Sequence, residues 1–275
     1  MNGSPPRIVP ILLYHSLTAY AAPRYAPYAV DPGLFRDHLA YLADAGFTAL
    51  TVRQLARGYR DPDVRWPARP IVLTFDDGFE EMATVALPAL ERARFRATFY
   101  VVSGTVGATS RWLKGEGEAQ RPLLDWAAIR DLDAAGHEIG AHGHTHRQLD
   151  VLPLLDASAE IGRSRAELEL GLGRSVATFA YPHGYSSAAV RQCVEDAGFD
   201  AACSVRNALS HPADDLFSLA RVMIGPGTSV EQLAALTAGE GIPRAGPTEQ
   251  LATRGWRLLR RARRLTVRKR VKASP

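Results

Sequence analysis

Cysteine is scarce in this chain of 275 residues, which holds only Cys193 and Cys203. Two cysteines exclude a disulfide-stapled scaffold and a cysteine-rich zinc site. No apolar run approaches the roughly 18–20 residues of a membrane-spanning helix, and residues 1–7 do not lead into the apolar stretch of a signal peptide. The expected location is therefore cytoplasmic, with neither a signal peptide nor a transmembrane helix.

Acidic residues are absent from the last 22 residues, which hold eight arginines and two lysines. The other 253 residues hold 23 basic and 29 acidic side chains, so the net charge of +4 arises from the tail. This distribution argues against nucleic acid as a partner of the whole protein. The segment from Arg254 to Lys272 carries leucines at helical spacing. It is either a solvated basic terminus or an amphipathic helix that contacts the inner face of a membrane.

The rest of the chain alternates short apolar runs with longer amphipathic stretches, which is typical of a parallel sheet covered by helices. About eight strands in a chain of this size favour an α/β barrel over an open sheet. The predicted strands are 8–14, 47–51, 71–75, 97–102, 138–141, 176–180, 201–205 and 219–224. The predicted helices are 32–45, 79–94, 125–135, 152–170, 186–197 and 229–238.

Two adjacent carboxylates, Asp76 and Asp77, follow the predicted strand 71–75. Charged groups at a buried strand end need partners, because desolvating an unpaired charge is costly. Neighbouring side chains point in different directions, so one carboxylate can bind a metal while the other handles protons. Taken alone, the Asp-Asp-Gly segment favours an aspartate that caps a turn or helix.

Four of the eight histidines lie within residues 137–146. On a helical turn, His142 and His146 would lie on one face and could bind one metal ion. His144 would point away from them, and His137 is interpreted as structural. One aspartate with two histidines and open positions is typical of a catalytic rather than a structural metal site.

Two weaker features accompany these motifs. The segment Tyr181-Pro-His-Gly can present a backbone N–H to a reacting oxygen, and His15 ends the first predicted strand. In isolation, a plain turn is the better explanation of the first feature and a structural histidine the better explanation of the second. All four features, however, fall at the carboxyl ends of predicted strands, where α/β barrels carry their active sites.

Together these residues resemble the NodB-homology polysaccharide deacetylases, carbohydrate esterase family four, over residues 8–236. The first two family motifs are Thr-Phe-Asp-Asp-Gly at 74–78 and His-x-x-x-His at 142–146, and the third is matched loosely at 181–184. The early Leu-Tyr-His that ends at His15 is similar to the subgroup that deacetylates exopolysaccharide of the poly-N-acetylglucosamine kind. The resemblance implies a distorted (β/α) barrel of about seven to eight parallel strands.

By the same resemblance, Asp76 is the general base, and Asp77, His142 and His146 bind a divalent metal, which we expect to be zinc, with cobalt or nickel as alternatives. His15 is the candidate general acid. His183 competes for that role, and its main-chain N–H would help to hold the oxyanion. One deacetylase domain is expected over 1–240, with its motif core at about 69–224, followed by a basic tail over 241–275.

The sequence departs from the family pattern at three points. Ala180 stands where the family usually has an arginine that steadies the base, and His183 replaces the usual aromatic residue after the proline. The late Leu-x-x-His motif that would supply the acid is missing.

The expected activity is that of a hydrolase of non-peptide carbon–nitrogen bonds, which removes N-acetyl groups from an amino-sugar polysaccharide. Two alternatives stay open: a deformylase or amidase that acts on a small non-sugar amide, and a non-catalytic glycan-binding module. Trp112 and Trp126, near the long segment 105–120, are placed to stack on a sugar ring or to pack in the core.

Overall fold

The computed structural model describes residues 8–245, which form a closed (β/α) barrel. Parallel strands run round the ring in the order β1, β10, β9, β8, β7, β6 and β5, and β5 pairs back with β1. An additional strand, β4 (Thr48–Leu50), extends the sheet at the beginning of β5. The ring strands are β1 (Ile11–Tyr14), β5 (Pro70–Phe75), β6 (Thr98–Val101), β7 (Glu138–Ala141), β8 (Thr178–Ala180), β9 (Ala201–Val205) and β10 (Leu219–Met223). The predicted barrel and all eight predicted strand positions are confirmed.

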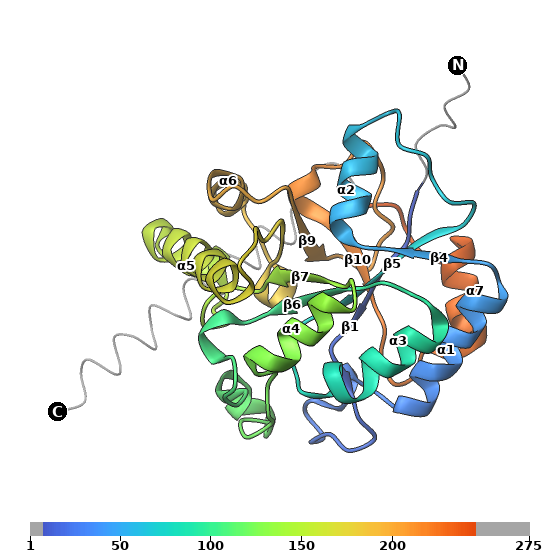
Figure 1. Cartoon of the computed structure of the whole chain (residues 1–275), viewed down its shortest axis with the longest axis horizontal. Coiled ribbons are helices and arrows are strands. Elements are labelled where there is room, and N and C mark those ends of the chain that lie inside the picture. Colours follow the sequence, from blue (N-terminus) through green and yellow to red (C-terminus); the bar gives the residue numbers. More distant parts are fainter. Residues whose placement is uncertain (1–7, 246–275) are drawn as a thin grey trace.

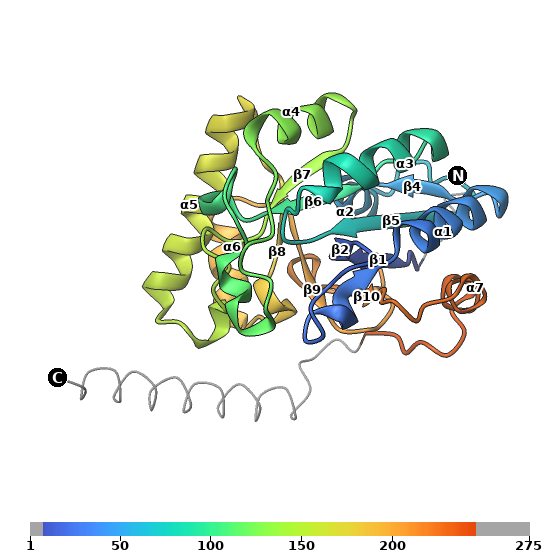
Figure 2. The same cartoon turned by 90° about the horizontal axis from the view of Figure 1, so that it is seen from below.

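Helices cover the outside of the ring (Figures 1 and 2), and the buried apolar residues of each outer helix belong to the main hydrophobic core. Aspartate or serine side chains accept hydrogen bonds from the first turns of four of them, as expected for N-caps. The outer helices are α1 (Pro32–Asp44), α3 (Leu87–Ala93), α4 (Trp126–Ala134), α5 (Leu154–Leu172), α6 (Ala188–Asp196) and α7 (Val230–Ala238). They match the predicted helices to within a few residues, except at the start of α3.

The predicted helix 79–94 begins later than expected. Its first turn is a π-helical segment, η2 (Met82–Ala86), and α3 starts only at Leu87. Pro88 explains the irregularity, because it has no N–H to donate to the carbonyl of Thr84 four residues earlier.

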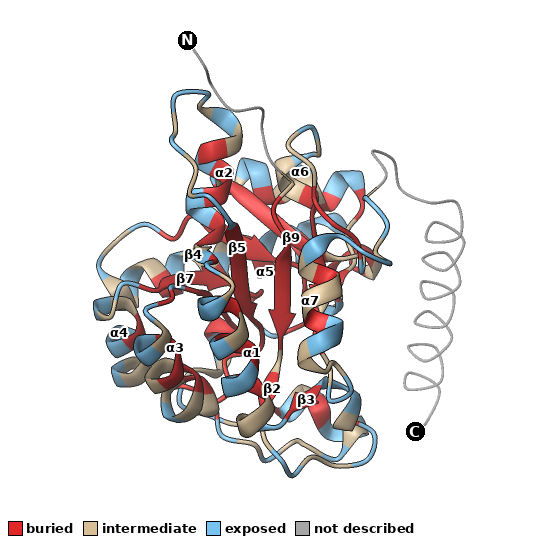
Figure 3. Ribbon diagram, turned by 90° about the vertical axis from the view of Figure 1, so that its right-hand side faces the viewer, coloured by how far each residue is buried: buried red, intermediate tan, exposed pale blue. Residues whose placement is uncertain are grey.

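The helix α2 (Val52–Arg60) was not predicted, and it closes one end of the barrel. Its buried residues Val52, Leu55 and Ala56 join the apolar cluster inside the ring, with Val72 and Leu219 among their partners. Figure 3 shows α2 at one end of the barrel and the short pair β2 (Ser16–Leu17) and β3 (Ala29–Val30) at the other. The site must therefore open at the end that carries β2 and β3, because α2 blocks the opposite end.

A buried glutamate at the α2 end ties this helix to the barrel. Glu138, at the start of β7, accepts hydrogen bonds from Thr98 Oγ1 at 2.9 Å, from Thr178 Oγ1 at 2.6 Å and from the Arg53 backbone N–H at 3.0 Å. Burial raises the pKa of this carboxyl, although the hydrogen bonds act against the rise. One side chain thus joins three strands and the first turn of α2.

We expect Glu138→Ala to lower the free energy of unfolding by about 3 kcal/mol, because buried donors lose their acceptor. Urea unfolding followed by circular dichroism measures the change. Glu138→Gln is the matched control, since it keeps the shape and one acceptor oxygen, and it should cost about 1 kcal/mol. A loss below 1 kcal/mol for the alanine variant would show that the network contributes little.

The sequence predicted a basic tail that could contact a membrane, and no membrane-spanning helix. The segment from Arg254 to Lys272 lies outside the described residues. Among the helices of residues 8–245, none combines the length and the apolar character needed to cross a bilayer.

Candidate active site

The two carboxylates lie where β5 ends, on the open side of the barrel. The Asp76 backbone N–H donates to the Tyr14 carbonyl at 3.0 Å, which continues the pairing of β5 with β1. Asp77 and Gly78 then adopt positive φ angles of 76° and 75°. Such a conformation is unfavourable for a residue with a side chain, and it turns Asp77 away from the direction of Asp76.

The two histidines come from the segment that follows β7. His142 continues the strand, and its backbone N–H donates to the Val101 carbonyl at 2.9 Å. The predicted helical turn between them is wrong: residues 142–148 form a bent loop, with positive φ at Gly143 and His146. This loop nevertheless places the two imidazole rings 5.0 Å apart.

Asp77, His142 and His146 converge on one point. Asp77 Oδ1 lies 3.0 Å from His146 Nε2 and 3.5 Å from His142 Nε2. One ligand atom from each residue lies within 4.8 Å of the other two, and all three residues are buried. The Ala180 carbonyl lies 2.8 Å from His142 Nδ1, which leaves Nε2 directed at the carboxylate.

This arrangement fits a divalent metal. The buried Asp77 Oδ1 has no aligned hydrogen-bond donor among residues 8–245, despite the two imidazole nitrogens close to it. Two imidazole nitrogens with one carboxylate oxygen form a donor set that suits zinc and leaves positions open for water and substrate. An ion at the centre would satisfy Asp77 Oδ1, which otherwise lacks a partner among the described residues.

Arg221, which the sequence analysis missed, holds Asp76. Its guanidinium donates to both carboxylate oxygens, from Nη1 to Oδ1 at 2.6 Å and from Nη2 to Oδ2 at 2.7 Å. Both side chains are buried inside the barrel. Burial by itself would raise the pKa of Asp76, but the Arg221 charge, together with that of His142, brings it below the ordinary value. Asp76 is thereby kept ionised and fixed in orientation.

The family motif usually has an arginine at the position of Ala180. In this chain an arginine from β10 lies beside Asp76 instead. A signal was present in the sequence, because Arg221 interrupts the apolar strand Leu219–Met223. A buried arginine needs a charged or strongly polar partner. The chain therefore does have an arginine beside Asp76, but another strand carries it.

The two candidate acids, His15 and His183, both lie near residues of the triad. His15 is partly buried against Tyr28, with ring centroids 5.4 Å apart. Its Nδ1 is buried and makes no hydrogen bond within the described chain. Burial lowers the pKa of His15, while the nearby carboxylates of Asp77 and Asp76 act in the opposite direction.

His183 adopts a left-handed backbone conformation, with φ of 61°, and its ring lies 4.8 Å from that of His146. Burial, together with the charge of His146, lowers the pKa of His183 to about 4. His15 therefore has both carboxylates as partners of opposite charge, whereas His183 has the like charge of His146 beside it.

His144, Trp112 and Trp126 do not belong to the donor set. His144 points away from the triad, toward Ser103 and Glu167, with Nδ1 2.9 Å from Glu167 Oε2. The Trp112 ring stacks on His146 at 4.8 Å. Trp126 packs against Gly171 of α5, so it belongs to the helix packing rather than to the site.

We expect His146→Ala to weaken zinc binding by more than 100-fold, because loss of a direct ligand exceeds the roughly 10–100-fold cost of losing a supporting residue. Metal content after dialysis, measured by elemental analysis, tests this. His144→Ala is the matched control and should retain one equivalent. Unchanged zinc content in His146→Ala would remove His146 from the ligand set.

Comparisons with known proteins give the family of the chain. The polysaccharide deacetylase family model matches residues 63–202, slightly more than half of the chain. The Bacillus subtilis (strain 168) protein YxkH, which has a provisional polysaccharide deacetylase name, is 22% identical over 224 residues, 82% of this chain and 74% of that protein. The poly-beta-1,6-N-acetyl-D-glucosamine N-deacetylase of Staphylococcus aureus (strain MRSA252) is 21% identical over 206 residues, 72% of this chain and 68% of that protein.

A solved structure supports the fold. The Streptococcus pyogenes deacetylase PplD, in complex with acetate, superposes with a TM-score of 0.72 and 24% identity. The superposition covers 83% of this chain and 97% of that one. The family match spans both carboxylates and both histidines of the triad region. The chain belongs to the polysaccharide deacetylase family, the NodB-homology enzymes of carbohydrate esterase family four, which hydrolyse amide bonds.

Proposed function

We propose that this chain is a metal-dependent hydrolase that removes N-acetyl groups from an amino-sugar polysaccharide. The observation that carries the proposal is the buried donor set of Asp77, His142 and His146 beside Asp76, which Arg221 holds ionised. The Staphylococcus aureus relative is named for a β-1,6-linked N-acetylglucosamine polymer. We extend that substrate class to this chain.

Asp77, His142 and His146 would hold the divalent metal, with zinc as our proposal and cobalt or nickel as alternatives. Bound there, the metal would supply Lewis acidity toward the acetamide carbonyl and lower the pKa of water. The positive φ of Asp77 and the bend at His146 pre-position the protein ligands.

Asp76 would accept a proton from the attacking water. Each of its oxygens takes one hydrogen bond from Arg221 and keeps a second lone pair free. The main-chain N–H of His183 would help to stabilise the oxyanion that forms at the carbonyl.

His15 would donate a proton to the leaving nitrogen, since the amine cannot depart as an anion. The nearby carboxylates of Asp77 and Asp76 favour the protonated imidazole and so partly offset the effect of burial. The products would be acetate and a free glucosamine-type amine.

Acetate release is the direct test of the proposal. The metal-stripped chain, reloaded separately with zinc, cobalt and nickel, is incubated with β-1,6- and β-1,4-linked N-acetylglucosamine oligomers and with small cyclic amides. We expect acetate from an oligomer only in the metal-loaded samples. Turnover of a cyclic amide alone would favour the small-amide hydrolase, and glycan binding without any turnover would favour a binding module.

We also propose that residues 1–240 form the catalytic domain and that the segment from Arg254 to Lys272 contacts an anionic membrane surface. Its ten positive charges support electrostatic attraction to acidic lipids. Sedimentation with phosphatidylglycerol vesicles, compared with neutral vesicles, tests this contact.

A further inference from the structure

The two oxygens of Asp77 have different surroundings. Oδ1 faces the imidazole nitrogens of His142 and His146, whereas Oδ2 accepts a hydrogen bond from the Tyr25 hydroxyl at 3.3 Å. Tyr25 lies outside the family motifs, on the loop between β2 and β3. The orientation of the carboxylate is therefore restricted through Oδ2, by a residue that is distant in the sequence.

Tyr25 is suited to act only as a donor. The side chain is buried, and a tyrosine hydroxyl, with an ordinary pKa of about 10, carries its proton at neutral pH. The hydroxyl thus stays protonated next to the carboxylate. A donor on Oδ2 leaves Oδ1 as the oxygen that is free for a cation.

The ring of Tyr25 is itself held by its neighbours. It lies 5.4 Å from the ring of Tyr28 and 5.9 Å, edge to face, from that of Phe79. The Arg121 guanidinium lies 4.3 Å from the centre of the Phe79 ring and 5.5 Å from that of Tyr25. These contacts restrict where the hydroxyl can point.

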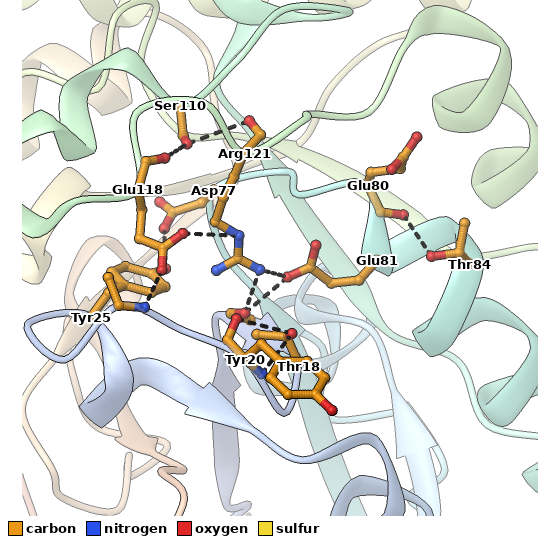
Figure 4. A network of polar contacts seen from close by, with 12 residues as sticks. Thr18, Tyr20, Tyr25, Asp77, Glu80, Glu81, Thr84, Ser110, Glu118 and Arg121 are labelled. Atoms are coloured by element: carbon orange, nitrogen blue, oxygen red, sulfur yellow. Dashed lines mark hydrogen bonds and ion pairs between the residues drawn. The ribbon is translucent and has the colours of Figure 1, made fainter.

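Arg121 connects three segments around the site, and Figure 4 shows it between Glu118 and Glu81, with Asp77 and Tyr25 beside it. It pairs with Glu81, four residues after Asp77, and donates to Ser16 Oγ at 2.6 Å. Its Nε lies 3.8 Å from Glu118, whose side chain also accepts from the Ala22 backbone N–H. The loop that carries Tyr25 is thereby fastened to the turn that carries Asp77.

We propose that Tyr25 is a positioning residue of the metal centre, which orients Asp77 through its hydroxyl and is kept in place by Arg121. The inference rests on the metal centre of the proposed function. It predicts that the Tyr25 hydroxyl contributes to metal affinity although it does not touch the metal. Groups that orient a metal ligand in this way change affinity by about 10–100-fold.

The test is a zinc titration of metal-stripped Tyr25→Phe in competition with a chromophoric chelator. We expect the dissociation constant to rise about tenfold or more, and the absorption spectrum of the cobalt-loaded variant to change. Tyr20→Phe is the matched control, because Tyr20 lies on the same loop, is 91% exposed, and its hydroxyl has no hydrogen-bond partner within residues 8–245. The urea midpoint of each metal-free variant reports any general loss of stability.

Zinc affinity in Tyr25→Phe equal to that of Tyr20→Phe would overturn the inference, even if the variant were less stable. Tight zinc binding by the parent without acetate release would instead contradict the proposed function while the affinity comparison still decides the role of Tyr25. A parent chain that binds no metal would overturn both.

Arg121→Lys tests the second part of the inference. Lysine keeps the charge but loses the planar group that packs on the two rings. We expect a several-fold loss of zinc affinity in the parent background and no further loss in Tyr25→Phe. Equal losses in both backgrounds would show that Arg121 acts independently of Tyr25.

Discussion

Asp76→Asn is expected to lower kcat/KM for acetate release by about 10³-fold while one equivalent of metal stays bound. An amide cannot accept the proton of the attacking water, and general-base catalysis contributes roughly 10²–10⁴-fold. Asp77, His142 and His146 are untouched, so the donor set persists. Acetate release and metal content are measured on the same preparation.

The substitution also leaves the Arg221 charge without its carboxylate, so the metal-loaded variant must be shown to be folded by urea unfolding. Asp77→Asn is the informative comparison, because it should lose metal affinity as well as activity. Loss of metal by Asp76→Asn instead would make Asp76 a ligand, and the assignment of the base would fail.

Arg221→Met is expected to lower the free energy of unfolding at pH 7 by about 3–5 kcal/mol, because it leaves a buried carboxylate without its partner. The pair is fully enclosed and joined by two hydrogen bonds. Arg36→Met, the same change at an exposed position on α1, should stay within about 0.5 kcal/mol of the parent. A loss below 1 kcal/mol in Arg221→Met would show that the pair is not important for stability.

The same variant should change the pH dependence. In the parent, the pKa of Asp76 lies below its ordinary value of 3.8, so the stability contributed by ionised Asp76 is complete above that value and is lost as the pH falls through the folded-state pKa. Without Arg221, the effect of burial, already the largest single cause, is no longer outweighed by that charge and raises the pKa of Asp76. We therefore expect the stability difference between parent and variant to narrow as the pH falls from the variant's raised pKa toward the parent's lowered one, and the acid limb of the pH–activity profile to move to higher pH.

The sequence predicted much of the site because its local patterns are strong. Asp77 and His142 each end or follow an apolar strand, and the carboxyl ends of parallel strands in a barrel meet on one face. The barrel itself followed from the alternation of buried strands and amphipathic helices. The prediction of a helical turn between His142 and His146 was wrong, because glycine at 143 and a left-handed His146 bend the chain instead.

The tertiary structure alone decided which residues support the site. Arg221 reaches Asp76 across the interior of the barrel, between β10 and β5, which are not neighbours in the ring. Tyr25 reaches Asp77 from a loop with no regular pattern. The helix α2, by contrast, was predictable, because Val52, Leu55, Ala56 and Tyr59 have helical spacing and follow a Thr51–Gln54 capping box. Local composition and spacing report which residues share a strand or a helix face, whereas contacts across the barrel depend on how the ring closes.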